Sequence, residues 1–134
     1  MGCCGVRMTP GWPPNFHPDE FRCKCCKALG NEHVARHLAW TLQRIRNIVG
    51  PLKITSSYRC PQHNANVGGA KNSQHVENTA ADLKAIEIGP TQLQHHILGM
   101  MEQNVIPNGG LGRYDTFTHY DMRLNPARWD QRSK

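Results

Sequence analysis

The sequence lacks a long apolar run, because no stretch approaches the roughly 18 consecutive apolar residues that a membrane span needs. Its first residues, MGCCGVRMTPGWPPNF, contain no apolar core segment and do not read as a secretory signal. A lipid anchor is also disfavoured, since Val6 stands where the myristoylation pattern favours Ser or Thr. Internal repeats and low-complexity segments are absent as well. We therefore expect a globular protein without membrane insertion.

The remaining composition is that of an ordinary globular domain. The chain has 134 residues, which is enough to bury one core, and 38% of them are hydrophobic. Its net charge of +6 suits an anionic partner such as nucleic acid or a bacterial envelope, and charge alone does not choose between them. The basic residues are scattered rather than clustered with aromatic residues on one face, so we expect no nucleic-acid partner.

Six cysteines leave three interpretations open. Without a secretory signal, reduced thiols are the default, and a disulfide is an alternative. The third interpretation is a structural zinc site built from Cys23, Cys26, Cys60 and one further ligand. Its spacing is poor, because the chain has no second C-x-x-C pair to match Cys23 and Cys26. The sequence does not decide the state of any member of the set, which comprises Cys3, Cys4, Cys23, Cys25, Cys26 and Cys60.

Hydrophobic periodicity predicts two helices. The first follows Asn31, which can cap it, and ends at Gly50-Pro51, with apolar residues recurring every three or four positions. The second begins at Pro90 and extends to about Gln103. Its predicted buried residues are Leu93, Ile97, Met100 and Met101.

Strands are predicted between and after these helices. LKITSSYR (52–59) and AADLKAIEI (80–88) read as strands, and residues 104–124 hold one or two more. Residues 60–74 show no hydrophobic periodicity and are predicted to form a long loop. The tail from residue 125 is polar and is predicted to be irregular. The predicted fold class is α+β, a small and mostly antiparallel sheet with helices packed on one side. Residues 1–20 are predicted to form an N-terminal arm, and 21–134 a single domain.

Three residues have the chemistry of a zinc site. Alternation along a strand places His119 and Asp121 on one face, and an adjacent strand can bring Asp82 to His119 while His75 enters from a loop. Two imidazoles and one carboxylate suit Zn²⁺, and three protein ligands leave a fourth position for water. That is the arrangement of a catalytic metal site, although single His and Asp residues are more often ordinary surface groups.

Three sequence blocks carry a resemblance to a known family. ITSSYRC, GGAKNSQHVENTAADL and GRYDTFTHYDMR resemble the signature blocks of the D-Ala-D-Ala carboxypeptidase-like zinc peptidases. These belong to a superfamily with lysostaphin-type and hedgehog domains. The resemblance extends from Phe16 to Trp129 and is closest to short, single-domain versions from phages and bacteria. It implies the hedgehog-like fold of these peptidases.

The resemblance also implies roles for individual residues. His75, Asp82 and His119 match the ligands of one zinc ion. Arg59 matches the arginine that receives a carboxylate or carbonyl of the peptide substrate, for which a planar guanidinium is well suited. Ser73 matches a serine that supports the ligand loop near the substrate, and its role can be limited to a turn hydrogen bond.

The chain departs from the family pattern in two places. Asn78 stands where a glycine is common, and Asn tolerates a left-handed backbone better than most residues. Thr116 stands where many relatives have the catalytic carboxylate. Short members of the family share YDTF before this histidine, so the resemblance implies Asp115, one residue earlier, as the candidate general base. Asp121 is its rival, because it shares the strand face of His119. Asp121 could instead orient a ligand imidazole.

The implied function is zinc-dependent hydrolysis of peptide bonds in bacterial cell-wall peptidoglycan, by a carboxypeptidase or endopeptidase resembling an endolysin. Such a protein would act as a monomer, and would collect in the cytoplasm of the producing cell or travel in a virion. The bond cleaved stays open between D-Ala-D-Ala, L-Ala-D-Glu and a cross-bridge. A non-catalytic, zinc-containing binding module of the hedgehog kind is the alternative.

Overall fold

A computed structural model describes residues 9–70 and 73–133. Both predicted helices and all three predicted strand regions are confirmed, and the residues between 104 and 124 form two strands. In chain order the elements are the 3₁₀ helix η1 (Pro18–Phe21), α1 (Glu32–Val49), β1 (Leu52–Ser56), α2 (Pro61–Asn66), β2 (Ala80–Ala85), α3 (Pro90–Glu102), β3 (Gly110–Arg113), β4 (Thr118–Asp121) and β5 (Ala127–Asp130).

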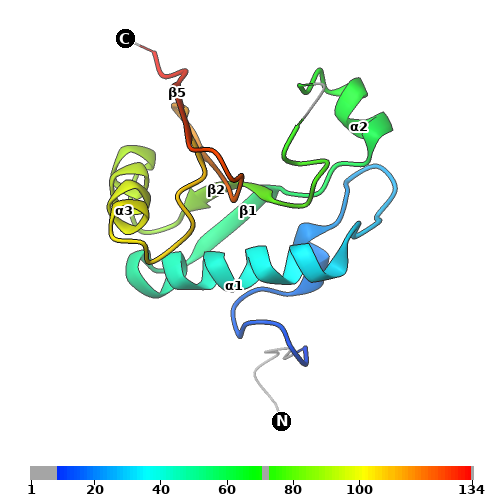
Figure 1. Cartoon of the computed structure of the whole chain (residues 1–134), viewed down its shortest axis with the longest axis horizontal. Helices are drawn as coiled ribbons and strands as arrows, with labels where there is room; N and C mark the ends of the chain where they lie inside the picture. Colours follow the sequence, from blue (N-terminus) through cyan, green and yellow to red (C-terminus); the bar gives the residue numbers. More distant parts are fainter. Residues whose placement is uncertain (1–8, 71–72, 134) are drawn as a thin grey trace.

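The five strands form one sheet in the order β1-β2-β4-β3-β5. Its two edge strands, β1 and β5, are labelled in Figure 1. The β1–β2, β2–β4 and β3–β4 pairs are antiparallel, and only β3–β5, among the described strands, is parallel. The predicted α+β class with a mostly antiparallel sheet is therefore confirmed.

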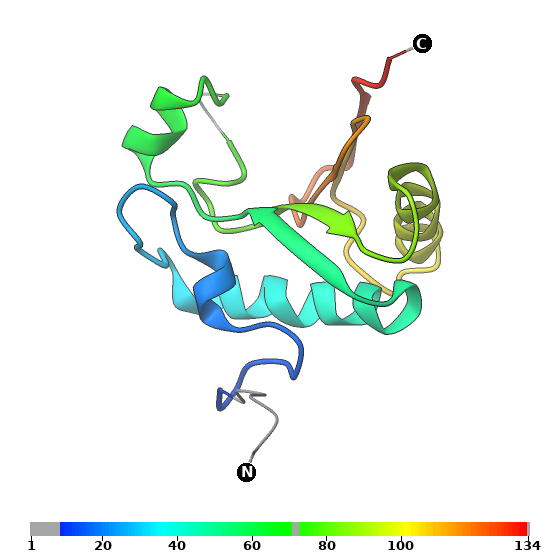
Figure 2. The ribbon, with the colours of Figure 1, turned by 180° about the vertical axis from the view of Figure 1, so that it is seen from behind.

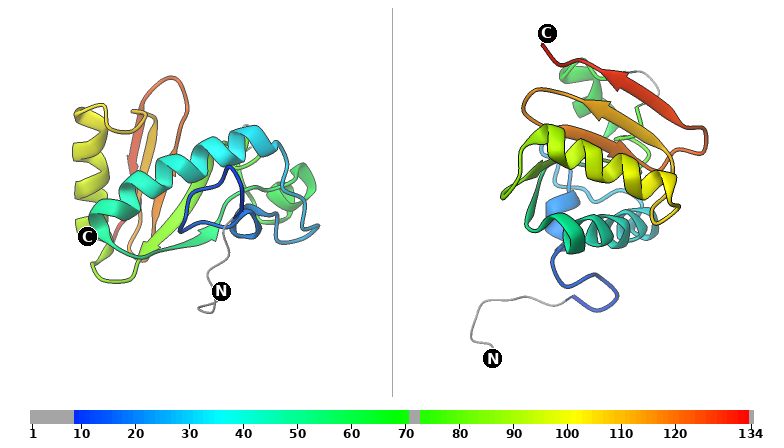
Figure 3. Two further views of the ribbon diagram at one scale, coloured as in Figure 1. Left: turned by 90° about the horizontal axis from the view of Figure 1, so that it is seen from below. Right: turned by 90° about the vertical axis from the view of Figure 1, so that its left-hand side faces the viewer.

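Helices α1 and α3 lie next to each other and cover one face of the sheet (Figure 3). Because side chains alternate along a strand, Leu83 of β2 and Tyr120 of β4 enter the core beneath these helices. Asp82 and His119, one position away, face the opposite side. The hydrophobic face of the sheet is therefore used for packing, and its other face is available for a functional site.

The limits of α1 follow from local chemistry. The Asn31 side chain accepts a hydrogen bond from the Val34 backbone N–H at 3.2 Å, which caps the first turn. Gly50, with φ of 87°, ends the helix in a conformation that disfavours residues with a side chain. No helix in the described ranges combines the length and apolar character required to cross a membrane.

The described part of the predicted arm contributes to the core. Trp12 and Phe16 are both buried, and their rings lie 5.5 and 6.2 Å from the ring of Phe21. Seen from behind, this segment passes beside the beginning of α1 and close to β1 (Figure 2). The segment is irregular in backbone conformation and packs closely against the helical layer.

Two stretches differ from the prediction. The predicted loop 60–74 contains the short helix α2, which starts where Pro61 occupies the first helical position and the Cys60 side chain accepts from His63 N–H. The tail, predicted to be irregular, contains β5, which pairs with the edge of the sheet along β3. Neither stretch is long enough to show a hydrophobic period, which explains why sequence alone missed them.

Candidate metal centre and active site

Asp82 and His119 face each other because β2 and β4 pair at this position in the antiparallel register. His119 Nδ1 lies 3.0 Å from Asp82 Oδ1, and His75 Nε2 lies 3.4 Å from Asp82 Oδ2. The three side chains are buried and offer ligand atoms that all lie within 4.8 Å of one another. The structure thus brings together the three residues that the sequence singled out as metal ligands.

His75 is held in one orientation by its surroundings. Its Nδ1–H donates to the backbone carbonyl of Ser57 at 2.7 Å, so its Nε2 is directed at Asp82. The backbone N–H of His75 donates to Ser73 Oγ at 3.1 Å, and its carbonyl accepts from Arg59 N–H at 3.2 Å. Ser73 therefore makes a turn hydrogen bond that supports the His75 loop.

Asn78 replaces the glycine of the family pattern without loss of the turn. It adopts φ of 66°, in the left-handed region that Asn tolerates. Its buried side chain donates to the Leu29 carbonyl at 2.7 Å and accepts from Asn31 N–H at 2.8 Å. The asparagine thus joins the His75 turn to the start of α1.

His119 lies between two carboxylates. Its Nε2 is 2.7 Å from Asp121 Oδ2, and its Nδ1 faces Asp82. Asp121 is fully buried and also accepts hydrogen bonds from Arg123 Nε at 2.8 Å, Arg123 Nη2 at 2.7 Å and Gly110 N–H at 3.0 Å. With Nε2–H donating to Asp121, Nδ1 is left as the nitrogen that could bind a metal.

Electrostatics favour the charged forms of these groups. Burial acts to raise the pKa of Asp82, but hydrogen bonds with His119 and His75 outweigh burial and hold it well below its ordinary value. Burial likewise acts to raise the pKa of Asp121, and the Arg123 and His119 hydrogen bonds keep it low. For His119, burial acts to lower the pKa, yet the two carboxylates raise it. The two carboxylates therefore stay ionised, as a carboxylate must be to bind a metal.

The donor set fits zinc. Tetrahedral zinc with ligand distances of about 2.1 Å places neighbouring donor atoms roughly 3.4 Å apart. The three residues offer ligand atoms that all lie within 4.8 Å of one another, so small shifts bring them to this spacing. The nitrogen of each imidazole that faces away from Asp82 already donates to an oxygen, as is usual for metal-bound histidine.

Arg59 lies beside this cluster. Its Nη2 is 3.7 Å from Asp82 Oδ2, and its Nη1 donates to Asn64 Oδ1 at 3.3 Å. A side chain at Gly69 would overlap Asn64, so glycine allows the loop to pass behind the Arg59–Asn64 pair. The guanidinium therefore lines the same hollow as the candidate metal ligands.

A hollow of about 340 Å³ lies over the cluster. Its aromatic wall, formed by Tyr114, Phe117 and Trp129, was not predicted from the sequence. The rings of Tyr114 and Phe117 stack at 4.3 Å. The ring of Trp129 lies 5.0 Å from the ring of His119, and its Nε1–H donates to Tyr114 Oη at 2.9 Å. The Arg123 guanidinium lies 5.2 Å from the centre of the Trp129 ring. A lone tryptophan in a polar tail was the available signal, and only the β3–β5 pairing shows where it points.

The structure does not bring Asp115, the candidate base, to this hollow. Its carboxylate is exposed and accepts hydrogen bonds from the backbone N–H and hydroxyl of Ser133, the latter at 2.7 Å. It lines a separate depression with Asp130 and Arg132. The reason is local: residues 114–117 form a turn between β3 and β4, so the alternation that sets the direction of His119 does not extend to Asp115.

Comparison with known proteins agrees with this site. A family model described as Peptidase M15 matches residues 14–121, a range that includes Arg59 and all three candidate ligands. The chain belongs to the M15 peptidase family, which confirms the resemblance noted in its sequence. It is also 44% identical over 48 residues to the zinc D-Ala-D-Ala carboxypeptidase of Streptomyces albus G. That match covers 34% of this chain and 19% of the relative, so the chain matches about a fifth of that protein's length.

Proposed function

We propose that this protein is a zinc-dependent metallopeptidase that hydrolyses peptide bonds of bacterial peptidoglycan, as a D,D-carboxypeptidase or an endopeptidase. The observation that carries the proposal is the buried His75–Asp82–His119 cluster, which opens onto a hollow shared with Arg59. Membership of the M15 family and the partial likeness to a zinc D-Ala-D-Ala carboxypeptidase support the same reaction class.

His75, Asp82 and His119 would hold one zinc ion. When bound, zinc supplies a water of lowered pKa and polarises the scissile carbonyl. Asp121 acts as a positioning residue, because it accepts from His119 Nε2–H and so keeps Nδ1 directed at the metal position. The Ser57 carbonyl does the same for His75.

The walls of the hollow suit a peptide with free carboxylates. Arg59 presents a planar guanidinium that can receive a carboxylate through two hydrogen bonds, and Arg123 adds a second positive charge nearby. Tyr114 and Phe117 supply an apolar side against which a small side chain such as that of alanine can pack. Peptidoglycan peptides combine these features, and the net charge of +6 suits an anionic wall polymer. A lysin-like role on the cell wall follows from this proposal.

A second candidate function is a zinc-containing binding module of the hedgehog kind. One observation favours it: of the residues that the structure describes, Asp82 is the sole carboxylate lining the hollow. Asp121 is fully occupied by His119 and Arg123, and Asp115 lies elsewhere. A metallopeptidase needs a group that takes a proton from water, so this candidate predicts binding without cleavage.

Mass spectrometry of purified peptidoglycan incubated with the zinc-loaded protein separates the two functions. The peptidase predicts new peptide termini, and the fragment masses name the bond. His119→Ala, incubated in parallel, should release nothing. Co-sedimentation with insoluble peptidoglycan and no fragments in any preparation would establish the binding module in place of the enzyme.

A further inference from the structure

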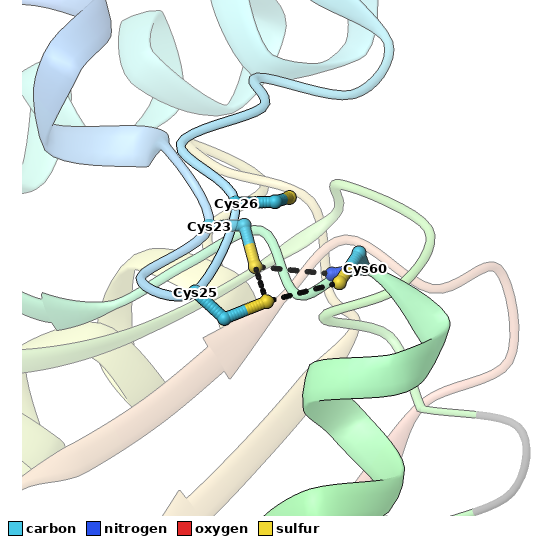
Figure 4. A group of neighbouring side chains, drawn as sticks. All are labelled: Cys23, Cys25, Cys26 and Cys60. Carbon is cyan, nitrogen blue, oxygen red and sulfur yellow. Dashed lines mark hydrogen bonds between the residues drawn. The ribbon is translucent and has the colours of Figure 1, made fainter.

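A second group of metal-binding side chains lies outside the site described above. Cys23, Cys25 and Cys26 come from the loop between η1 and α1, and Cys60 stands at the start of α2, 35 positions after Cys25. Their four sulfur atoms lie within 4.8 Å of one another. In Figure 4 the loop and the first turn of α2 bring these side chains to one place.

The spacing of the sulfurs is that of a tetrahedral thiolate site. Zinc bound at about 2.3 Å to four sulfurs separates neighbouring sulfurs by roughly 3.8 Å. The Cys23–Cys25 and Cys25–Cys60 distances are 3.6 and 3.3 Å, and the other pairs fall within the 4.8 Å limit. A shift of less than an ångström per sulfur would therefore complete the tetrahedron.

The backbone around the cluster supports thiolates. Cys60 N–H donates to Cys23 Sγ at 3.4 Å, and His63 N–H donates to Cys60 Sγ at the same distance. A donor directed at sulfur stabilises the deprotonated form that a metal requires. The loop itself is a tight turn, in which Cys23 N–H donates to Ala28 O at 2.8 Å and Lys27 adopts φ of 65°.

Charge and geometry favour a metal over a disulfide. Four thiolates around Zn²⁺ carry a net charge of −2, and Lys24 and Lys27 in the same loop offset it. A disulfide holds its two sulfurs about 2.0 Å apart, whereas Cys25 and Cys60, which have the shorter of the two sulfur–sulfur contacts described above, lie 3.3 Å apart. The four described cysteines are all free thiols in the structure.

We propose that Cys23, Cys25, Cys26 and Cys60 bind a second, structural zinc ion. A four-cysteine site has no open position for water, so its role is to hold chain segments together. It would fasten the Cys23–Cys26 loop to the segment that carries Arg59, whose neighbour Cys60 is a ligand. The hydrogen bond from Tyr58 N–H to Phe21 O, at 3.2 Å, joins the same two segments.

Zinc content measured on purified full-length protein tests the assignment. The wild type should hold two zinc ions per chain. The double variant Cys25→Ser/Cys60→Ser should hold one, and His75→Ala/His119→Ala should also hold one. The matched control, Cys3→Ser/Cys4→Ser, changes two cysteines outside the described residues and should keep two.

The outcomes separate this inference from the proposed function. One zinc in the wild type that persists in the cysteine double variant would overturn the four-cysteine site and leave the peptidase proposal intact. Loss of a zinc from the Cys3/Cys4 control would overturn the assigned ligand set. Conversely, an inactive protein with two zinc ions would leave the cysteine site standing.

A spectroscopic measurement covers the case in which the cysteine double variant fails to fold. His75→Ala/His119→Ala, prepared without metal and loaded with Co²⁺, should show the intense near-ultraviolet charge-transfer band of cobalt–thiolate bonds. Alkylation should label the four cysteines only after the metal is removed by a chelator. Bound cobalt without that band, or a disulfide located by peptide mapping between two of these four cysteines, would overturn the proposal.

Discussion

The two clusters of metal-binding side chains differ in almost every physical respect. His75, Asp82 and His119 are buried on the face of a sheet, where strand pairing sets the distance between two of them. The cysteine cluster, by contrast, joins a loop to the start of α2, and Cys25 and Cys26 are exposed. One set mixes nitrogen and oxygen donors, and the other consists of sulfur alone.

This difference indicates that one site is suited to catalysis and the other to holding chain segments together. The sheet site has three protein donors and opens onto a hollow, so a fourth metal position is available to a substrate or water. The cysteine site has four donors and is closed. Arg59 lies between the two, paired with Asp82 on one side and followed by Cys60 on the other. We infer that Arg59, the proposed substrate contact, is positioned by both clusters.

The largest expected effect comes from removing a ligand of the sheet site. Asp82→Ala should lose the zinc of this site and with it all peptide cleavage, because Asp82 contacts both imidazoles and Arg59. Metal analysis and peptidoglycan digestion are the measurements. The cysteine-bound zinc should remain, which makes it an internal control for folding. Full zinc occupancy in His75→Ala, Asp82→Ala or His119→Ala would remove that residue from the site.

Arg59 tests whether substrate positioning is separable from metal binding. Arg59→Ala should retain both zinc ions and lose roughly 10- to 100-fold in kcat/KM, the cost of hydrogen bonds to a charged group. Arg59→Lys should recover only part of this, since an ammonium cannot form the bidentate pair. Wild-type kinetics in Arg59→Ala would show that another residue, such as Arg123, receives the substrate carboxylate.

Sequence reasoning reached the sheet site because its signals are local and regular. Side chains alternate in direction along the strand that contains His119, and apolar residues recur every three or four positions along α1. Both patterns are visible within a few residues, and they predicted the sheet and the helical layer correctly. The position of Asp115 depended on where β4 begins, and that boundary is set by tertiary contacts. Trp129 and Cys25 could not be placed because their partners lie far along the chain: β3 for Trp129 and Cys60 for Cys25.

The two rival aspartates give a smaller and more discriminating effect. Asp121→Asn should weaken zinc binding at the sheet site by roughly 10- to 100-fold, with activity recovering as zinc is added, because it orients His119. Asp115→Asn, its matched control, should change neither zinc affinity nor turnover, since its carboxylate lies outside the hollow. An inactive Asp115→Asn that keeps its zinc would restore Asp115 as the general base and require the 114–117 turn to rearrange.

The smallest expected effect concerns the hydrogen bond between Trp129 and Tyr114, which joins β5 to the aromatic wall. Trp129→Phe keeps a ring near His119 and removes the donor, and Tyr114→Phe removes the acceptor from the other side. Each should lower the free energy of unfolding by about 0.5–1.5 kcal/mol, and the double variant should lose less than the sum, because both remove one bond. Both zinc ions should remain in all three variants. A drop in zinc content confined to Trp129→Phe would show that β5 helps to form the metal centre. The aromatic wall and the metal site would then not be independent of each other.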